Sequence, residues 1–255
     1  MKLSIITINK NNAEGLRRTI ESVVAQTLDD FEYIVIDGAS TDGSVDVIRQ
    51  YEDRISYWVS EPDKGIYNAM NKGIARANGE YLLFLNSGDY LVDKNVLVNV
   101  VAYELKEDIV YGEQLVEKNG SLQKTLFLEP ESISFYSFIK SSLPHQCTFI
   151  CKNLFDKIGL YNESNKIVSD WEFNMLALFK YNVLLRKINC PIAVYDSTGI
   201  SSDVSLSKIH QEEKKRVLYT YFPRIMKDVE SIEALKRSRL YRILEFCRKL
   251  KNLFL

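Results

Sequence analysis

The sequence predicts an α/β protein whose mostly parallel central sheet is covered by helices on both faces. The first observation is an alternation within residues 1–91, in which short apolar runs rich in β-branched residues are followed by segments whose apolar residues recur at helical spacing. The second is that each apolar run stops at polar residues and glycine, as strands do where they leave a sheet. Strands that alternate with helices of this length are joined by crossovers and pair in parallel.

The elements of the first half follow from this alternation. The strands predicted from apolar runs cover residues 3–8, 33–36, 55–60 and 81–85. The helices predicted from apolar side chains three and four residues apart cover residues 13–26, 45–51 and 68–77.

The second half of the chain is less regular. Asn119-Gly120 lies between two strand-like segments and predicts a β-hairpin. A further strand is expected at residues 147–151, and two helices at residues 153–158 and 169–180. We expect one main domain over residues 1–205, followed by a C-terminal helical extension over residues 206–255.

Composition and charge are those of an ordinary soluble protein. Of 255 residues, 46% are hydrophobic and 26% charged, and the formal net charge of −1 argues against nucleic acid as a partner. The four cysteines lack the spacing of zinc ligands or of a disulfide framework, which suits thiols kept reduced in the cytosol. No run is long enough for a signal peptide or for a membrane span of roughly 18 apolar residues. We therefore expect a cytoplasmic protein, or one that touches the inner face of the cytoplasmic membrane from its surface.

The C-terminal tail differs in charge from the rest of the chain. Residues 234–255 carry seven Lys and Arg residues against a single glutamate, Glu245. One helical stripe holds the apolar residues Leu240, Ile243, Leu244, Cys247, Leu250 and Phe254. A basic amphipathic helix of this kind can lie on an anionic membrane surface. The alternative is a terminal helix packed on the protein body or in a homodimer.

Polar residues follow each predicted strand of the first half, at Asn9, Asp37, Asp63 and the segment 86–89. Open parallel sheets bind ligands beyond the carboxyl ends of their strands, so these side chains are expected to line one site. Asp37 could accept hydrogen bonds from a base or from sugar hydroxyls. The alternative is a local turn in which nearby polar residues, Asp42 among them, cap the next helix.

The segment "LNSGD", residues 85–89, ends in a carboxylate that suits a divalent cation. Magnesium accepts one or two protein carboxylates and completes its shell with phosphate oxygens and water, so Asp89 alone is adequate. Gly88 would let the backbone approach a ligand closely, and Asn86 could hydrogen-bond a ribose. The alternative for Asp89 is a turn residue that caps the helix expected to start near Asp93.

Two long segments, "LSIITINKNNAEGLRRTIESVVAQTLDDFEYIVIDGASTDGS" and "SEPDKGIYNAMNKGIARANGEYLLFLNSGD", carry a resemblance to a known family. They look like the nucleotide-sugar-binding half of family-2 glycosyltransferases with the GT-A fold. The segment "PHQCTFICKNLFDKIGLYNESNKIVSDWEFNMLAL" is similar to the acceptor half of bacterial colanic-acid and capsule enzymes. The resemblance covers residues 2–200 and implies a nucleotide-sugar-binding half, residues 1–112, and an acceptor half, residues 113–205.

Position by position, the resemblance implies the residues of the site. Asp89 matches the acid that binds Mn²⁺ or Mg²⁺ beside the donor diphosphate, and Asp170 matches the general base of inverting members. The positions implied to contact the nucleotide sugar are Thr7, Ile8 and Asn9 beside the base, Asp37 on the base or ribose, and Asp63, Lys64 and Asn71 along the pocket. The chain departs from the family where many members carry more acids, at Asn86, Ser87, Gly88 and Ser169.

Several of these residues have structural alternatives. Asp170 could cap its own helix, in which case Glu172 is the fallback acid. His145, in the turn before a predicted strand, could contact the diphosphate or the acceptor, or be a hydrogen-bonded structural histidine. Lys64 could steady the diphosphate or be an exposed turn lysine.

Together these features favour a glycosyltransferase that moves one sugar from a nucleotide-diphosphate donor to a free or lipid-linked saccharide in surface polysaccharide synthesis. The expected cofactor is Mn²⁺ or Mg²⁺. A nucleotidyltransferase on a similar sheet is the enzymatic alternative, although the loop "TINKNNAEG" lacks its Gly-rich, basic character. An NAD dehydrogenase is disfavoured because GxGxxG is missing. A nucleotide-sugar-binding subunit without catalysis stays open because the metal motif has few acids.

Overall fold

The structure is a computed structural model that describes residues 3–118, 120–197, 199, 204–238 and 241. The chain divides into two compact units, residues 1–210 and 211–255. The sheet and all the residues of the predicted site belong to the first unit.

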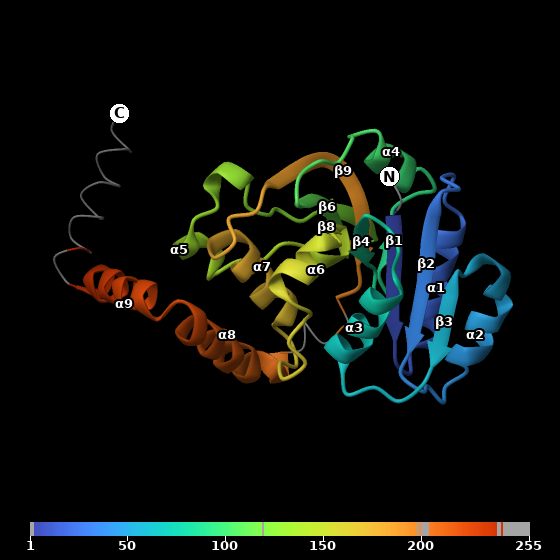
Figure 1. The fold of residues 1–255 in the computed structure, drawn as a ribbon, viewed down its shortest axis with the longest axis horizontal. Helices are drawn as coiled ribbons and strands as arrows, with labels where there is room; N and C mark the ends of the chain where they lie inside the picture. The colour runs from blue at the N-terminus through green and yellow to red at the C-terminus, as the bar shows by residue number, and fades with distance from the viewer. Residues whose placement is uncertain (1–2, 119, 198, 200–203, 239–240, 242–255) are drawn as a thin grey trace. The chain divides into compact units, whose positions relative to one another are not determined.

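Four parallel strands form the first half of the sheet, in the order β3-β2-β1-β4 (Figure 1). They are β1 (Leu3–Asn9), β2 (Phe31–Asp37), β3 (Tyr57–Ser60) and β4 (Tyr81–Phe84). The register pairs Asn9 with Asp37 and Asp37 with Ser60, so the polar strand ends lie side by side. This alignment confirms that the predicted strands end at one edge of the sheet.

Helices cover both faces of these strands because successive side chains of a strand point to opposite faces. On one face, Leu3 and Ile5 pack in a cluster with α1 (Ala13–Val24) and α2 (Ser44–Gln50). On the other face, α3 (Ile66–Arg76) lies against β1 and β2. The approach there is close, since a Cβ on Gly73 would lie 2.5 Å from Ile6.

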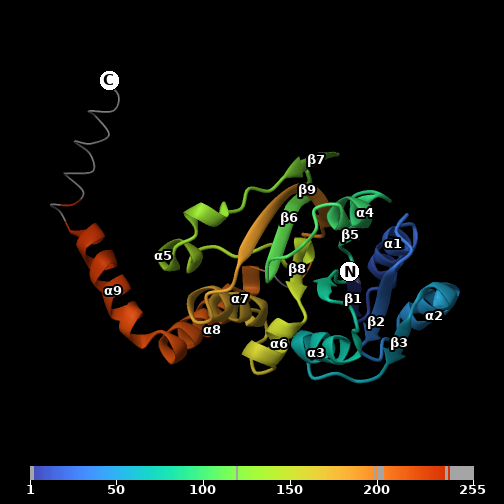
Figure 2. The same ribbon diagram turned by 45° about the horizontal axis from the view of Figure 1, so that its top comes forward.

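The second half adds strands of mixed direction (Figure 2). They are β5 (Tyr90–Leu91), β6 (Ile109–Lys118), β7 (Ser121–Lys124), β8 (Thr148–Cys151) and β9 (Leu185–Tyr195). β8 joins β4 to β6 by antiparallel pairing, and β9 runs parallel to β6 and antiparallel to β5. β6 and β7 form the hairpin expected around Asn119-Gly120. The sheet is thus parallel in its first half and mixed in its second.

An aromatic cluster attaches the helices of the second half to the sheet. Phe84 of β4 packs edge-on against Phe155 and Tyr161, and Phe155 stacks on Phe173 with ring centroids 4.6 Å apart. These residues belong to or adjoin α6 (Asn153–Ile158) and α7 (Ser169–Phe179), which Figure 2 shows beside β8. The remaining helices of this unit are short: α4 (Val96–Val101), α5 (Phe135–Phe138) and the 3₁₀ turns Glu52–Arg54, Pro130–Ser132, His145–Cys147 and Val204–Leu206.

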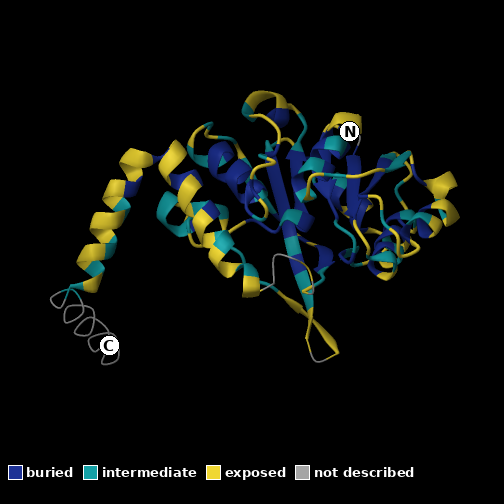
Figure 3. Cartoon of the chain, turned by 90° about the horizontal axis from the view of Figure 1, so that it is seen from below, coloured by how far each residue is buried: buried dark blue, intermediate teal, exposed yellow. Residues whose placement is uncertain are grey.

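The central strands are buried along most of their length, whereas the hairpin of β6 and β7 is exposed at its end (Figure 3). A sheet buried on both faces explains why the first strands read as continuous apolar runs.

The second unit contains most of α8 (Ser207–Tyr221), which begins in the first unit, and α9 (Pro223–Arg237). Pro223 occupies the first turn of α9, where a missing N–H is tolerated. Within the described ranges, no helix combines the length and the apolar character needed to cross a membrane. The stripe predicted from Leu240 to Phe254 lies outside the described residues.

Candidate functional site

The polar strand ends meet at a cavity of about 500 Å³. Six of the predicted site residues line it, namely Ile8, Asn9, Asp63, Asn86, Asp89 and His145. The other lining residues are Lys10, Asn12, Gly65, Ile66, Ala69, Ser87, Tyr195, Asp196 and Gly199. The cavity is therefore built from the ends of β1, β4 and β9, the start of α3 and the turn before β8.

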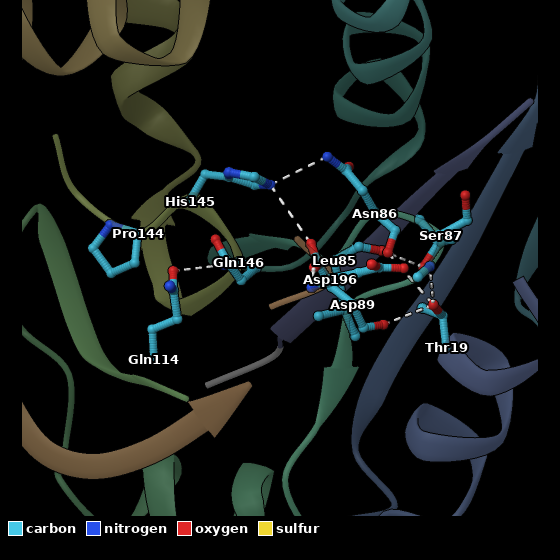
Figure 4. Close-up of polar contacts among 12 residues, drawn as sticks. Thr19, Leu85, Asn86, Ser87, Asp89, Gln114, Pro144, His145, Gln146 and Asp196 are labelled. Atoms are coloured by element: carbon cyan, nitrogen blue, oxygen red, sulfur yellow. Dashed lines mark hydrogen bonds and ion pairs between the residues drawn. The ribbon is translucent and has the colours of Figure 1, made fainter. Parts of the chain in front are cut away.

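Asp89 lies in the turn that follows β4, and its side chain is almost completely buried (Figure 4). Its Oδ1 accepts a 2.8 Å hydrogen bond from the backbone N–H of Asp196, and its Oδ2 lies 3.9 Å from Nε2 of His145. Burial raises the pKa of the Asp89 carboxyl from 3.8 to about 6, against the opposing effects of His145 and of the Asp196 N–H. Asp89 does not cap a helix, since α4 begins at Val96 after Asn95.

His145 faces both Asp89 and Asn86 across the cavity (Figure 4). Nδ2 of Asn86 lies 3.1 Å from Nε2 of His145. An amide N–H₂ only donates, so in this contact Asn86 is the donor and Nε2 of His145 is the acceptor. Oδ1 of Asn86 is buried and has no hydrogen-bond partner among the described residues. Asn86, His145 and Asp89 thus face one another in the same part of the cavity.

This donor set fits one divalent cation of the Mg²⁺ or Mn²⁺ type. The 3.9 Å between Oδ2 of Asp89 and Nε2 of His145 is less than twice a metal–ligand distance of about 2.1 Å, so both groups can contact one ion. Among the described residues, no cluster of three His, Cys, Asp or Glu side chains would hold a metal by itself. The remaining ligands would have to be phosphate oxygens and water, which commonly complete the coordination of Mg²⁺ in proteins that bind phosphate-containing substrates.

Gly88 does not line the cavity. Its φ of +109° is in the region that favours glycine, and a Cβ there would lie 2.6 Å from Oδ2 of Asp196. The approach of the Asp196 carboxylate, rather than of a ligand, is therefore what requires a glycine at this position.

Asp37 is fully buried and is not part of the cavity lining. Oδ1 accepts hydrogen bonds from Asn9 Nδ2 and Ser40 Oγ, and Oδ2 accepts from the Ser40 N–H and Ser60 Oγ, at 2.6–2.9 Å. Burial alone would raise the pKa of Asp37, but the hydrogen bonds from Ser40, Ser60 and Asn9 outweigh it and lower the pKa below its ordinary value. In this structure Asp37 fixes Asn9 and the loop after β2, and its expected contact with a base or ribose stays a prediction.

The other residues predicted around the nucleotide fall into two groups. Thr7 is buried and hydrogen-bonds Leu85 O, whereas Asp63 lines the cavity with Lys10 Nζ 4.0 Å from its carboxylate. Lys64 is exposed and is not part of the lining. Asn71 is buried away from the cavity, where its amide hydrogen-bonds the backbone of Tyr161 and the carboxylate of Glu163.

Asp170 lies in the first turn of α7 but does not cap it. The N-cap position is Val168, without a side-chain hydrogen bond. Oδ1 of Asp170 instead accepts a 2.9 Å hydrogen bond from the hydroxyl of Tyr67 on α3. Burial, followed by the Asp170 carboxylate, raises the pKa of Tyr67 well above its usual range, so this hydroxyl stays a donor. Glu172, the fallback acid, is buried and accepts hydrogen bonds from Asn162 and Asn165, which gives it a structural role.

Among the cavity residues that did not emerge from the sequence are Lys10, Asn12, Tyr195 and Asp196. Asp196 follows the apolar run 192–194 at the end of β9. The rule that placed Asp37 and Asp89 at strand ends could therefore have found it, had β9 been predicted. Asn12 is the N-cap of α1, where its side chain accepts from the Gly15 N–H.

Sequence comparison places the chain among known transferases. The sequence profile described as glycosyl transferase family 2 matches residues 4–155. An uncharacterized glycosyltransferase of Mycobacterium tuberculosis H37Rv is 36% identical over 204 residues, which are 78% of this chain and 77% of that protein. A PGL/p-HBAD biosynthesis glycosyltransferase of Mycobacterium bovis is 29% identical over 211 residues, 80% of each chain.

Solved structures agree in fold. S. aureus TarS (residues 1–349) superposes with a TM-score of 0.64 at 21% identity, over 77% of this chain and 61% of the TarS chain. The mannosyltransferase PcManGT from Pyrobaculum calidifontis, solved with GDP-Man and Mn²⁺, superposes with a TM-score of 0.59 at 13% identity, over 95% of this chain and 82% of that chain. These likenesses confirm the expected GT-A fold, and the profile match and the mycobacterial relatives establish the family: the chain is a glycosyltransferase of glycosyl transferase family 2.

Proposed function

We propose that this glycosyltransferase takes a sugar from a nucleoside diphosphate donor and transfers it, with inversion, to a saccharide acceptor carried on a lipid. The observation that carries the donor part is the cavity at the strand ends, where Asp89 and His145 face each other. TarS structures with UDP and with UDP-GlcNAc, and the PcManGT structure with GDP-Man, support a nucleotide sugar as the donor.

In this proposal Asp89 and His145 hold one Mn²⁺ or Mg²⁺ ion together with the donor diphosphate. When bound, such an ion neutralises charge that develops on the leaving diphosphate. Lys10, whose ammonium lies at the cavity beside Asp63, is a second positive charge available to the phosphates. Ile8 and Asn9 form the part of the cavity lining that would contact the nucleobase of the donor.

Asp170 is the proposed general base. The acceptor hydroxyl oxygen attacks the anomeric carbon as the bond from that carbon to the diphosphate oxygen breaks, and the hydroxyl proton passes to the Asp170 carboxylate. The nucleoside diphosphate leaves with the bonding electrons. Asp170 is partly exposed and is anchored through Tyr67 to α3, whose residues Ile66 and Ala69 line the donor cavity.

The lipid-linked acceptor rests on the basic, amphipathic pattern of residues 234–255 and on the mycobacterial relative named for PGL biosynthesis. Such a tail would bring the enzyme to an anionic membrane surface, where a lipid-linked saccharide is located. Deletion of residues 234–255 is expected to abolish binding to vesicles that contain anionic lipid and to leave the fold intact. Equal vesicle binding with and without the tail would contradict this part of the proposal.

The catalytic part is tested by incubating the chain with Mn²⁺ and a panel of UDP-, GDP- and dTDP-sugars, and measuring release of the nucleoside diphosphate. Asp170→Asn is expected to lower the release rate by about 100-fold or more while donor binding persists, because it removes the base alone. Asp89→Asn is expected to abolish Mn²⁺-dependent donor binding. Asp156→Asn, on the exposed face of α6, is the matched control and should behave as the unmodified chain. Full activity of both Asp89→Asn and Asp170→Asn would refute the mechanism.

A further inference from the structure

Two neighbouring residues of α1, Arg18 and Thr19, contact the turn that carries Asp89, although neither lines the donor cavity. The turn spans residues 86–89, and of its backbone groups the Ser87 N–H donates to the Ile8 carbonyl of β1 at 3.1 Å. Its position therefore depends on the groups that hold its backbone.

Thr19 is fully buried and binds this turn through its hydroxyl (Figure 4). Oγ1 accepts the N–H of Gly88 at 3.0 Å and lies 2.7 Å from the carbonyl oxygen of Asp89. The carbonyls of Gly15 and Asn86 are more distant, at 3.0 and 3.4 Å. A hydroxyl has one proton to donate, and the shortest contact assigns it to Asp89. One side chain thus joins the backbones of two consecutive residues.

Arg18 connects the same turn to the end of β9. Its Nη2 donates to the Gly88 carbonyl at 2.7 Å and to Oδ2 of Asp196 at 3.0 Å. The guanidinium also lies over the Tyr90 ring, 5.1 Å from its centroid. Asp196 in turn donates its backbone N–H to Oδ1 of Asp89. Arg18 therefore ties together the two segments that fix the Asp89 carboxylate.

The consequence is an oriented carboxylate. With Oδ1 engaged by Asp196, the other oxygen is directed toward His145. We infer that Arg18 and Thr19 are positioning residues, which hold Asp89 in the orientation that binds the divalent cation together with the donor diphosphate. This inference rests on the cation site of the proposed function. Groups that orient a metal ligand are typically worth about 10- to 100-fold in metal affinity, although they do not touch the ion.

The test is the affinity for Mn²⁺ without turnover. Mn²⁺ is titrated into the full chain in the presence of UDP or GDP, whichever gives the larger Mn²⁺-dependent Tm shift, and free Mn²⁺ is measured by electron paramagnetic resonance. Thr19→Val keeps the shape of the side chain and removes the hydroxyl, so Mn²⁺ affinity should fall by about 10-fold or more. Thr19→Ser restores the hydroxyl and should bind within about 3-fold of the unmodified chain.

Arg18 is tested against a neighbour on the same helix. Arg18→Met should weaken Mn²⁺ binding by about 10-fold. Arg17→Met removes the same charge from a side chain that contacts Gln50 and Tyr51, and should leave the affinity unchanged. Both hydrogen bonds of Arg18 come from Nη2, so Arg18→Lys, whose ammonium can also serve two acceptors, should retain more of the affinity than Arg18→Met.

The outcomes separate this inference from the proposed function. If Asp89→Asn still binds Mn²⁺ as the unmodified chain does, the cation site itself is wrong and the inference falls with it. If Asp89→Asn loses Mn²⁺ but Thr19→Val and Arg18→Met bind normally, only the positioning role is overturned. Equal losses in Thr19→Val and Thr19→Ser would also overturn it, because the hydroxyl would then be irrelevant. Far-UV circular dichroism of each variant confirms that the comparison is made on folded protein.

Discussion

Replacing Asp89 with Asn is expected to stabilise the metal-free protein at neutral pH while it removes the affinity for Mn²⁺. Asn keeps an oxygen that can accept the Asp196 N–H, as Oδ1 of Asp89 does at 2.8 Å. It carries no charge, however, and the side chain at this position is buried. The variant therefore retains the hydrogen bond and loses the unfavourable burial of a carboxylate.

The magnitude follows from the raised pKa of Asp89. Burial raises this pKa from 3.8 to about 6. Between these values the folded chain binds more protons at this site than the unfolded chain, so the free energy of unfolding falls as the pH rises through the window. One pKa unit corresponds to about 1.4 kcal/mol, and a shift of about two units costs the folded protein about 3 kcal/mol above pH 6.

Urea unfolding in EDTA measures this difference. At about pH 7.5, Asp89→Asn should be more stable than the unmodified chain by about 3 kcal/mol, and at about pH 5 by roughly half as much. Asp156→Asn, on the exposed surface, should differ by no more than about 0.5 kcal/mol at either pH. A variant less stable at pH 7.5, or a difference that does not change with pH, would refute the reasoning.

Three further predictions concern the surroundings of the site. Gly88→Ala should destabilise the protein by about 1–3 kcal/mol and weaken Mn²⁺ binding, because its φ is +109° and its Cβ would lie 2.6 Å from Asp196; urea unfolding and Mn²⁺ titration measure both effects. Glu32→Ala should cost about 2–4 kcal/mol in urea unfolding without altering Mn²⁺ binding, since its carboxylate accepts hydrogen bonds from Ser4 and Asn78. Burial raises the pKa of the Cys147 thiol, so iodoacetamide should label it, by mass spectrometry, only after unfolding.

For each of these three predictions, a specific experimental result would contradict the structural reasoning. Unchanged stability of Gly88→Ala would mean that Asp196 moves away without cost. A parallel loss of Mn²⁺ binding in Glu32→Ala would show that this network, which also includes the Gly79 N–H bonded to Ser4, affects the cation site. Labelling of Cys147 in the folded chain at a rate similar to that of the partly exposed Cys151 would contradict its burial.

The strand ends were predictable because parallel pairing leaves little freedom. Once β1 and β2 are recognised as neighbouring parallel strands, Asn9 and Asp37 must end at the same edge, and the register pairs them directly. The cavity lining at Asn9, Asp63 and Asp89 follows from that edge. The roles of these residues were harder to predict, because their hydrogen-bond partners come from distant parts of the chain. Nothing in "VIDGAS" indicates that Asn9 and Ser60 both donate to Asp37.

The sequence also did not indicate which side of a helix faces the cavity. Ile66 and Ala69 line the cavity, three residues apart on one face of α3. Asn71 is two residues beyond Ala69, about 200° around the helix, and so it faces the loop at Tyr161 instead. The family resemblance made Asn71 a candidate, but the helical period places it elsewhere. In the same way, the sequence gives no sign that Arg18 and Thr19 differ from other helix residues. Their hydrogen bonds to the turn at residues 86–89 depend on the packing of α1 against that turn.

The structure shows that Asp170 does not cap its own helix, which was the alternative to a role as the general base. A carboxylate that caps its own helix has its lone pairs engaged by backbone N–H groups, which leaves little capacity for a substrate proton. Here Val168 takes the N-cap position, and Asp170 lies one residue into the helix, where the positive end of the helix dipole favours a carboxylate. Its described hydrogen bond comes from Tyr67, whose single proton is shared with the carbonyl of Ile167 at 2.5 Å. Tyr67 of α3, the helix whose first turn lines the cavity, therefore contacts both Ile167 and the proposed base Asp170.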